Sequence, residues 1–153
     1  MIVPPSTTAV RTPIRTDLSA LKFNQLAVVS ITLLALVLKL PVLTVVLGAA
    51  MLTGALRPDI SPLRAAYRAL GPLFGLKPEV VEEDPRAHHF AQGVGGTFLL
   101  ASALLTLSGL TAAGAVLGVL VIALAALNLS KKICVGCLMY FQYRRMRYAL
   151  LHR

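Results

Sequence analysis

The chain has 153 residues, of which 57% are hydrophobic and 14% are charged, and it carries a formal net charge of +9. This hydrophobic share exceeds that of ordinary soluble domains, so a membrane is the expected solvent and membrane lipids are expected partners. The basic residues flank apolar segments, which is the pattern of topology signals and of contacts with anionic lipid. We therefore predict no nucleic-acid role for the positive charge.

Residues 1–16 include Pro4, Pro5 and Pro13 and predict a flexible N-terminal tail. The first apolar stretch begins only after more than twenty polar or turn-rich residues. It lacks the layout of a cleavable targeting signal. We expect this stretch to remain in the protein as a membrane anchor.

The first apolar stretch lies between Lys22 and Arg57 and carries one charge, Lys39. As a single helix it would be about 50 Å long, well beyond the hydrocarbon thickness of a bilayer. We predict two helices, near 24–40 and 42–56, that turn at Lys39 and Pro41, because proline suits the first turn of a helix. One helix kinked at Pro41 and a re-entrant pair are the alternatives.

The middle segment predicts a short basic helix on the membrane surface. Ser61 is a good N-cap and Pro62 suits the first helical position. Apolar residues recur at helical spacing, with Arg64 and Arg68 on another face. The apolar set is Leu63, Ala66, Tyr67 and Leu70. The acidic run that follows, from Glu79 to Asp84, predicts a solvated linker.

The second apolar stretch, Phe90 to Ser130, has no charged side chain and would be about 60 Å long as one helix. It must turn back, and Ser108-Gly109 predicts the turn. We expect helices near 91–107 and 110–129. Two small-residue pairs, Gly114 with Gly118 and Ala50 with Gly54, predict close helix contact within the molecule in preference to a homodimer seam.

The orientation follows from the basic residues. Fourteen of the fifteen lie before the first helix, between the second and third, or after the fourth. With four crossings these segments share one face, which the positive-inside rule assigns to the cytoplasm. We predict a multi-pass membrane protein with both termini in the cytoplasm.

A repeat runs through the chain at a constant offset of 67 residues. Asp17, Ala20, Phe23 and Gln25 recur as Asp84, Ala87, Phe90 and Gln92. The sequence therefore predicts repeats over 17–78 and 79–153. The predicted fold is all-α, a four-helix bundle of two duplicated transmembrane hairpins, each followed by a basic interfacial helix.

The offset also predicts equivalent positions. Asp17 and Asp84 would cap the first and third helices, while Gln25 and Gln92 would hydrogen-bond across the symmetry axis. Tyr67 would correspond to Cys134, and the second interfacial helix would run from about Cys134 toward 150.

Cys134 and Cys137 are the only cysteines and form a Cys-x-x-Cys motif after the fourth helix. Residues three apart on a helix share a face, so the spacing allows a disulfide. A helix N-terminus and the neighbouring Lys131 and Lys132 favour the thiolate of Cys134. We predict Cys134 as the nucleophile and Cys137 as the resolving thiol. A persistent disulfide is not expected in a reducing cytoplasm.

Metal binding and inert packing are the alternatives for the two thiols. His88 and His89 lie on the same predicted face, so a site of Cys134, Cys137, His88 and His89, or of both cysteines with one of the histidines, is conceivable. Adjacent helical residues point about 100° apart and rarely bind one ion together. The sequence predicts no cofactor.

The same residues resemble a known bacterial membrane family, domain of unknown function 4395. The resemblance covers about residues 15–141 and rests on these motifs: Phe23-Asn24-Gln25, Ser61-Pro62, Asp84-Pro85-Arg86-Ala87 with Phe90 and Gln92, and Cys134-Val135-Gly136-Cys137. His88 stands where the family pattern implies proline. The resemblance implies four helices and, through the neighbourhood of the family's genes, a thioredoxin-like or sulfurtransferase partner.

Together these observations predict a redox component whose thiol pair exchanges disulfides or sulfane sulfur with a soluble partner. The alternative is a non-enzymatic scaffold, or an accessory subunit of a larger membrane complex or homo-oligomer. A solute channel is disfavoured because the interior offers few polar groups.

Overall fold

The computed structural model describes residues 15–151, so the predicted tail over 1–16 lies almost wholly outside the described residues. The described chain contains the following elements: β1 (Arg15–Asp17), α1 (Leu18–Val37), α2 (Pro41–Leu56), α3 (Pro62–Leu70), β2 (Val80–Glu82), α4 (Pro85–Leu107), α5 (Thr111–Lys131) and α6 (Val135–Leu151). Short 3₁₀ turns flank α3, at Pro58–Ile60 and Gly71–Phe74. The all-α class is confirmed.

Aspartates begin both α1 and α4. The Asp17 carboxylate accepts hydrogen bonds from the backbone N–H groups of Ser19 and Ala20, at 2.9 and 3.3 Å. Asp84 accepts one from the N–H of Arg86 at 3.0 Å. The predicted caps are confirmed, but the predicted helix starts at 24 and 91 are wrong by six residues. The prediction placed each helix start after the last charged residue, whereas a helix starts directly after its capping residue.

Both hairpins turn in the same way. Lys39 and Gly109 adopt positive φ angles of 52° and 90°. Just after them, the Leu40 N–H donates to the Ala35 carbonyl and the Leu110 N–H to the Leu105 carbonyl, each at 2.9 Å. Such bonds satisfy carbonyls at a helix end. The two predicted turns are confirmed, and the alternative of one helix kinked at Pro41 is wrong.

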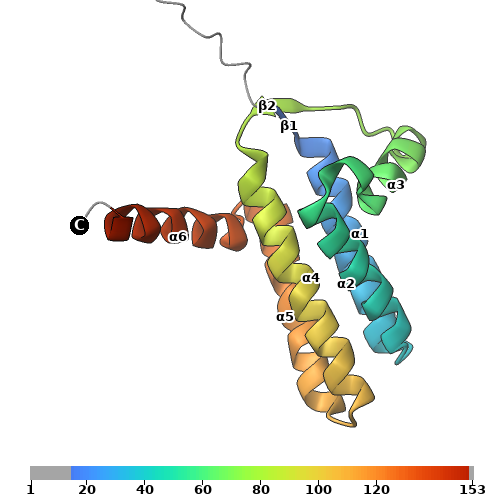
Figure 1. Ribbon diagram of the computed structural model, residues 1–153. Coiled ribbons are helices and arrows are strands. Elements are labelled where there is room, and N and C mark those ends of the chain that lie inside the picture. Colours follow the sequence, from blue (N-terminus) through green and yellow to red (C-terminus); the bar gives the residue numbers. More distant parts are fainter. Residues whose placement is uncertain (1–14, 152–153) are drawn as a thin grey trace, which may run out of the picture.

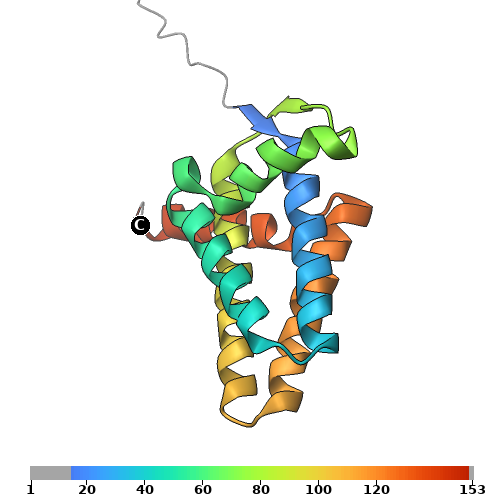
Figure 2. The same ribbon diagram turned by 90° about the vertical axis from the view of Figure 1, so that its right-hand side faces the viewer.

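The helices α1, α2, α4 and α5 lie side by side, with α2 against α4 and α1 against α5 (Figures 1 and 2). They share one buried core, formed by Val28, Leu47, Met51, Leu99, Val121 and Ala125. Gly48 and Gly96 bring α2 and α4 together, because a Cβ at Gly96 would lie 2.9 Å from the Gly48 carbonyl oxygen.

The small-residue pairs also face the interior. Gly114 is buried, and its carbonyl accepts a 2.6 Å hydrogen bond from the Ser102 hydroxyl of α4. Gly118 is buried against Leu36 of α1, and Gly54 against Gln92 of α4. These contacts confirm the prediction of close packing within the molecule.

The outer surface of these helices is apolar. Leu33, Val46 and Val116 are 52%, 60% and 67% exposed. Among the described residues, α1, α4 and α5 are long and apolar enough to cross a membrane. α2 is equally apolar but has 16 residues. An apolar exterior of this kind is characteristic of a membrane protein.

A two-stranded antiparallel sheet was not predicted. β1 pairs with β2, so that Arg15 lies opposite Glu82. Beside the sheet, Lys22 forms an ion pair with Glu79 at 3.0 Å. Residues 80–82 of the predicted linker therefore form a strand, while the acidic side chains of Glu79, Glu82 and Glu83 are exposed. Three-residue strands are too short to show the alternation that identifies a strand in a sequence.

The short helix α3 forms as predicted. Ser61 caps it by accepting a hydrogen bond from the Arg64 N–H at 3.4 Å. Tyr67 is buried, and its ring lies 5.7 Å from that of Phe23 on α1. α3 is thereby fixed across one end of the long helices (Figure 2).

Candidate functional site

The two cysteines lie where the chain leaves α5 and begins α6. Lys132 has a φ angle of 55° and ends α5 in the left-handed conformation. Two residues later the Cys134 sulfur accepts a 3.2 Å hydrogen bond from the Cys137 N–H. The Cys134 carbonyl accepts another from the Leu138 N–H at 3.0 Å. Cys134 is therefore the N-cap of α6, and the predicted position at a helix N-terminus is confirmed.

The sulfurs of Cys134 and Cys137 are joined as a disulfide, with Cα atoms 5.1 Å apart. The prediction that their spacing permits oxidation is confirmed. Cys137 is only 9% exposed, whereas Cys134 is partly exposed. Cys134 is therefore the more accessible of the two sulfurs, and its predicted role as the nucleophile stays a prediction.

Gly136, inside the motif, allows the first turn of α6 to pack closely against α4. A Cβ on Gly136 would lie 2.5 Å from the Cβ and 2.7 Å from the Cα of Ala91. Next to this contact, the rings of Phe90 and Tyr140 lie 5.6 Å apart. Close approach of the two backbones brings the first turn of α6 to the residues near the start of α4.

His88 of α4 reaches the buried cysteine. Its Nδ1 lies 3.5 Å from the Cys137 sulfur, and its Nε2 lies 3.4 Å from a carboxylate oxygen of Glu83. The imidazole therefore lies between a sulfur and an acid. This arrangement suits a group that moves a proton to or from the thiol. The sequence predicted that both His88 and His89 lie on the same face of the molecule as the cysteines. It did not predict which of the two contacts a sulfur.

The ligand atoms of His88, Cys134 and Cys137 lie within 4.8 Å of one another. With both thiols reduced, two sulfurs and one imidazole nitrogen suit a soft ion such as Zn²⁺. His89 does not belong to this cluster. The cluster corresponds to the alternative with two cysteines and one histidine that the sequence also allowed, and metal binding itself stays a prediction.

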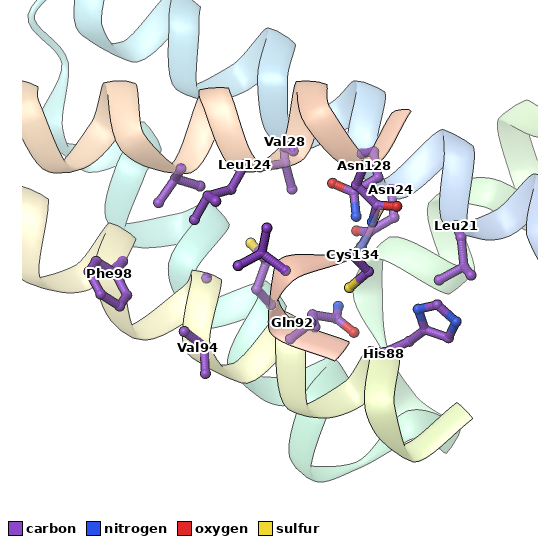
Figure 3. Close-up of a pocket in the computed structure, with 18 of the residues that line it drawn as sticks. Leu21, Asn24, Val28, His88, Gln92, Val94, Phe98, Leu124, Asn128 and Cys134 are labelled. Atoms are coloured by element: carbon purple, nitrogen blue, oxygen red, sulfur yellow. The ribbon is translucent and has the colours of Figure 1, made fainter. Parts of the chain in front are cut away.

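A partly open cavity of about 110 Å³ adjoins Cys134. Figure 3 shows carboxamide side chains from three helices around it, Asn24 of α1, Gln92 of α4 and Asn128 of α5. The rest of the wall is mainly apolar and includes Val28, Val94, Phe98 and Leu124. The Asn24 carboxamide oxygen is buried and has no hydrogen-bond partner.

The sequence analysis missed this cavity. Gln25 and Gln92 both line it, but the hydrogen bond between them stays a prediction. The cavity could have been predicted from its carboxamides, because each occurs singly, at a similar distance from the end of an otherwise apolar helix. Lys131 and Lys132 are exposed beside the motif. Their effect on the Cys134 thiolate also stays a prediction.

No curated protein and no solved structure matches this chain significantly. One family does match, over residues 16–145. These residues include the sheet, all four long helices, α3 and the cysteine motif. The chain belongs to the family described as Domain of unknown function (DUF4395).

Proposed function

We propose that the protein crosses the bacterial cytoplasmic membrane four times, with α3 and α6 on the cytoplasmic side. α2, with 16 residues, is about 24 Å long and needs slight thinning of the bilayer to cross. The positions of the basic residues support this orientation. Leu38 and Gly109 would then lie at the outer surface.

We further propose that the two hairpins arose by duplication. The aspartate caps are 67 residues apart, and the two turn hydrogen bonds, Leu40 to Ala35 and Leu110 to Leu105, are 70 apart. The caps of α3 and α6, Ser61 and Cys134, are 73 apart. The offset between equivalent positions therefore increases along the chain, from 67 to 70 to 73 residues. With the last of these offsets, Cys134 is equivalent to Ser61 and not to Tyr67.

The two short helices are proposed to lie along the inner membrane surface. α6 runs across the direction of the long helices (Figure 1). It exposes Leu138, Phe141 and Leu150 together with arginines at 144, 145 and 147. A helix that exposes apolar and basic side chains is suited to an interface of acyl chains and anionic headgroups.

We propose that the Cys134–Cys137 pair carries out thiol-disulfide exchange with a soluble cytoplasmic partner. The observation that carries this proposal is a disulfide at the N-terminus of α6, with one accessible sulfur and one buried sulfur next to an imidazole. Inert packing needs neither that exposure nor that imidazole. The partner class, a thioredoxin-like or sulfurtransferase protein, rests on the family resemblance.

The exchange proceeds in two displacements. A partner thiolate attacks the Cys134 sulfur, the bond to Cys137 breaks, and its electron pair stays on Cys137, which takes a proton from His88. The second partner thiolate then attacks its own sulfur in the mixed disulfide and releases Cys134 as a thiolate, which is protonated. Two electrons and two protons pass from the partner to the pair, and the partner leaves as a disulfide. In the sulfane-sulfur relay, the reduced Cys134 thiolate would attack the outer sulfur of a partner persulfide, the partner would leave as a thiolate, and Cys134 would carry the persulfide.

A trapping experiment tests this proposal. The purified Cys137→Ser variant in mild detergent, with the Cys134 sulfur activated as a mixed disulfide with thionitrobenzoate, is mixed with a reduced thioredoxin variant that lacks its second active-site cysteine. The thioredoxin thiolate is expected to displace thionitrobenzoate and form a covalent adduct at Cys134 that dithiothreitol reverses. The matched Cys134→Ser variant is expected to form none, because Cys137 is buried. If neither variant forms an adduct, and the double variant keeps full cellular function, the scaffold role replaces the redox role.

A further inference from the structure

The cavity beside Cys134 has the composition of a site for a small ring that carries oxygen atoms. Its wall is mainly apolar but also includes Cys134 and four carboxamide residues, Gln25 and the three labelled in Figure 3, Asn24, Gln92 and Asn128. Cys137 is not among the lining residues. The accessible sulfur of the pair is therefore the one in contact with whatever occupies the cavity.

The cavity also reaches the outer surface of the long helices. Phe98 of α4, Leu124 of α5 and Met139 of α6 line it and are 37%, 38% and 52% exposed. In a membrane-spanning protein these side chains face lipid or its boundary. A molecule dissolved in the bilayer can therefore enter from the side. About 110 Å³ is less than the roughly 150 Å³ of an apolar cavity that binds benzene, so a ring would seat at the mouth with its tail in lipid.

The carboxamides suit a ligand whose oxygen atoms accept hydrogen bonds in one redox state and donate them in the other. Each offers two N–H donors and one acceptor oxygen. A quinone carbonyl accepts a hydrogen bond, whereas a quinol hydroxyl donates one. The Gln92 and Asn128 side chains, which line the cavity, would donate to the quinone carbonyl and accept from the quinol hydroxyl.

We propose that this cavity binds a lipid-soluble quinone, which reoxidises the Cys134/Cys137 dithiol. The inference rests on the proposed exchange function, since a dithiol that takes electrons from a partner must pass them on before it can react again. Membrane quinones are established as acceptors for protein thiols. The protein would thus transfer electrons from a soluble dithiol to the quinone pool.

The quinone oxidises the Cys134/Cys137 dithiol in two steps. The Cys134 thiolate bonds to a ring carbon of the quinone. The Cys137 thiolate attacks the Cys134 sulfur, the carbon–sulfur bond breaks, and its electron pair remains on the ring. Both ring oxygens end protonated, so the dithiol loses two electrons and two protons and the quinone gains them as quinol.

The test uses the full chain, reduced and desalted in mild detergent without oxygen, and decylubiquinone as the probe. Loss of free thiols and loss of quinone absorbance are followed together. We expect one quinone to be reduced for every two thiols lost, and no reaction in the Cys134→Ser variant.

Two tryptophan variants locate the site. Leu124 and Leu127 are both on α5 and both 38% exposed, but only Leu124 lines the cavity. Leu124→Trp is expected to slow quinone reduction at least about tenfold, because removing a well-oriented contact geometry costs on that order. Leu127→Trp is expected to leave it unchanged. If Leu124→Trp disturbs folding, the smaller change Asn128→Leu should raise the quinone concentration needed for half-maximal rate.

The two proposals fail in different ways. If the Cys137→Ser variant forms the thioredoxin adduct but the wild-type protein does not reduce decylubiquinone, the quinone inference is overturned and the exchange function stays intact. Equal rates in the Leu124→Trp, Leu127→Trp and Asn128→Leu variants overturn the cavity as the site. Failure of both the adduct and the quinone reaction overturns the exchange function itself.

Discussion

Cys134 stands at the start of α6 as Ser61 stands at the start of α3. The sulfur of Cys134 accepts a hydrogen bond from the N–H three residues later at 3.2 Å, and the Ser61 hydroxyl accepts the corresponding bond at 3.4 Å. The two helices therefore begin with the same kind of cap, a side-chain acceptor bonded to the N–H three residues later. In one half the capping atom can also form a covalent bond to another sulfur.

The first prediction concerns this cap. Cys134→Ser is expected to keep α6 folded, because serine is a strong N-cap, whereas Cys134→Ala should lower stability by about 0.5–2 kcal/mol. Thermal unfolding in detergent, under reducing conditions so that no disulfide contributes, measures the difference. Ser130→Ala, at an exposed position near the end of α5, is the control. Equal midpoints for the serine and alanine variants would contradict a capping role.

The second prediction concerns Gly136. Gly136→Ala places a methyl group 2.7 Å from the Cα of Ala91, a backbone atom that cannot rotate away. We expect α6 to shift from α4, with a loss of about 1–3 kcal/mol and a lower rate of exchange at Cys134. Gly93→Ala is the matched control, since its added Cβ meets only the Ala55 side chain at 3.4 Å. An unchanged midpoint and rate for Gly136→Ala would show that the close contact is not required.

The third prediction concerns the proton at Cys137. His88→Asn is expected to slow disulfide exchange on the order of 10²-fold at neutral pH, because a positioned acid–base group contributes at least that much. Added imidazole should restore part of the rate, which a purely structural role would not allow. His89→Asn is the control, since His89 is outside the sulfur cluster. Stopped-flow kinetics against a small disulfide measures both variants.

The fourth prediction concerns metal. Zn²⁺ is expected to bind the reduced protein at His88, Cys134 and Cys137 and to block exchange until a chelator is added. Glu83→Gln should weaken zinc binding by about 10–100-fold, because a carboxylate that orients a ligating histidine contributes that much. Glu82→Gln, an exposed acid on β2, is the control. Inhibition of equal strength in both variants would contradict a role for Glu83 in orienting His88.

The fifth prediction concerns the number of crossings. In a background without cysteines (Cys134→Ser, Cys137→Ser), single replacements Leu38→Cys and Ser108→Cys are expected to react with a membrane-impermeant maleimide in intact cells. Arg68→Cys on α3 should react only after permeabilisation. All three native residues are exposed. Labelling of the Leu38 and Arg68 replacements from one side would show that α1 and α2 do not both cross.

The sequence predicted the elements that depend on local chemistry. Positive charge, apolar length and a proline or glycine at the turn were enough to find the four long helices and both reversals. The helix starts were misplaced because Lys22 and the polar residues before Phe90 lie inside helices that begin at Asp17 and Asp84.

The site was predicted only in part. The cysteine pair was identified because its spacing is local. The contacts of His88 with Cys137 and of Gly136 with Ala91 join residues more than forty positions apart. Tertiary packing alone decides which of two adjacent histidines reaches the sulfur. The same holds for the cavity, whose polar groups come singly from separate helices.

The pairing of β1 with β2 has a consequence for how the molecule is assembled. The ladder ties the segment leading into α1 to the segment leading into α4, and Lys22 bonds Glu79 across the same junction. Gly75, exposed and in the left-handed conformation, lies in the only covalent connection between the halves. A nick there would leave two fragments that still share a ladder, an ion pair and the α2–α4 and α1–α5 surfaces. Such fragments are expected to stay associated as a noncovalent pair after the peptide link is cut.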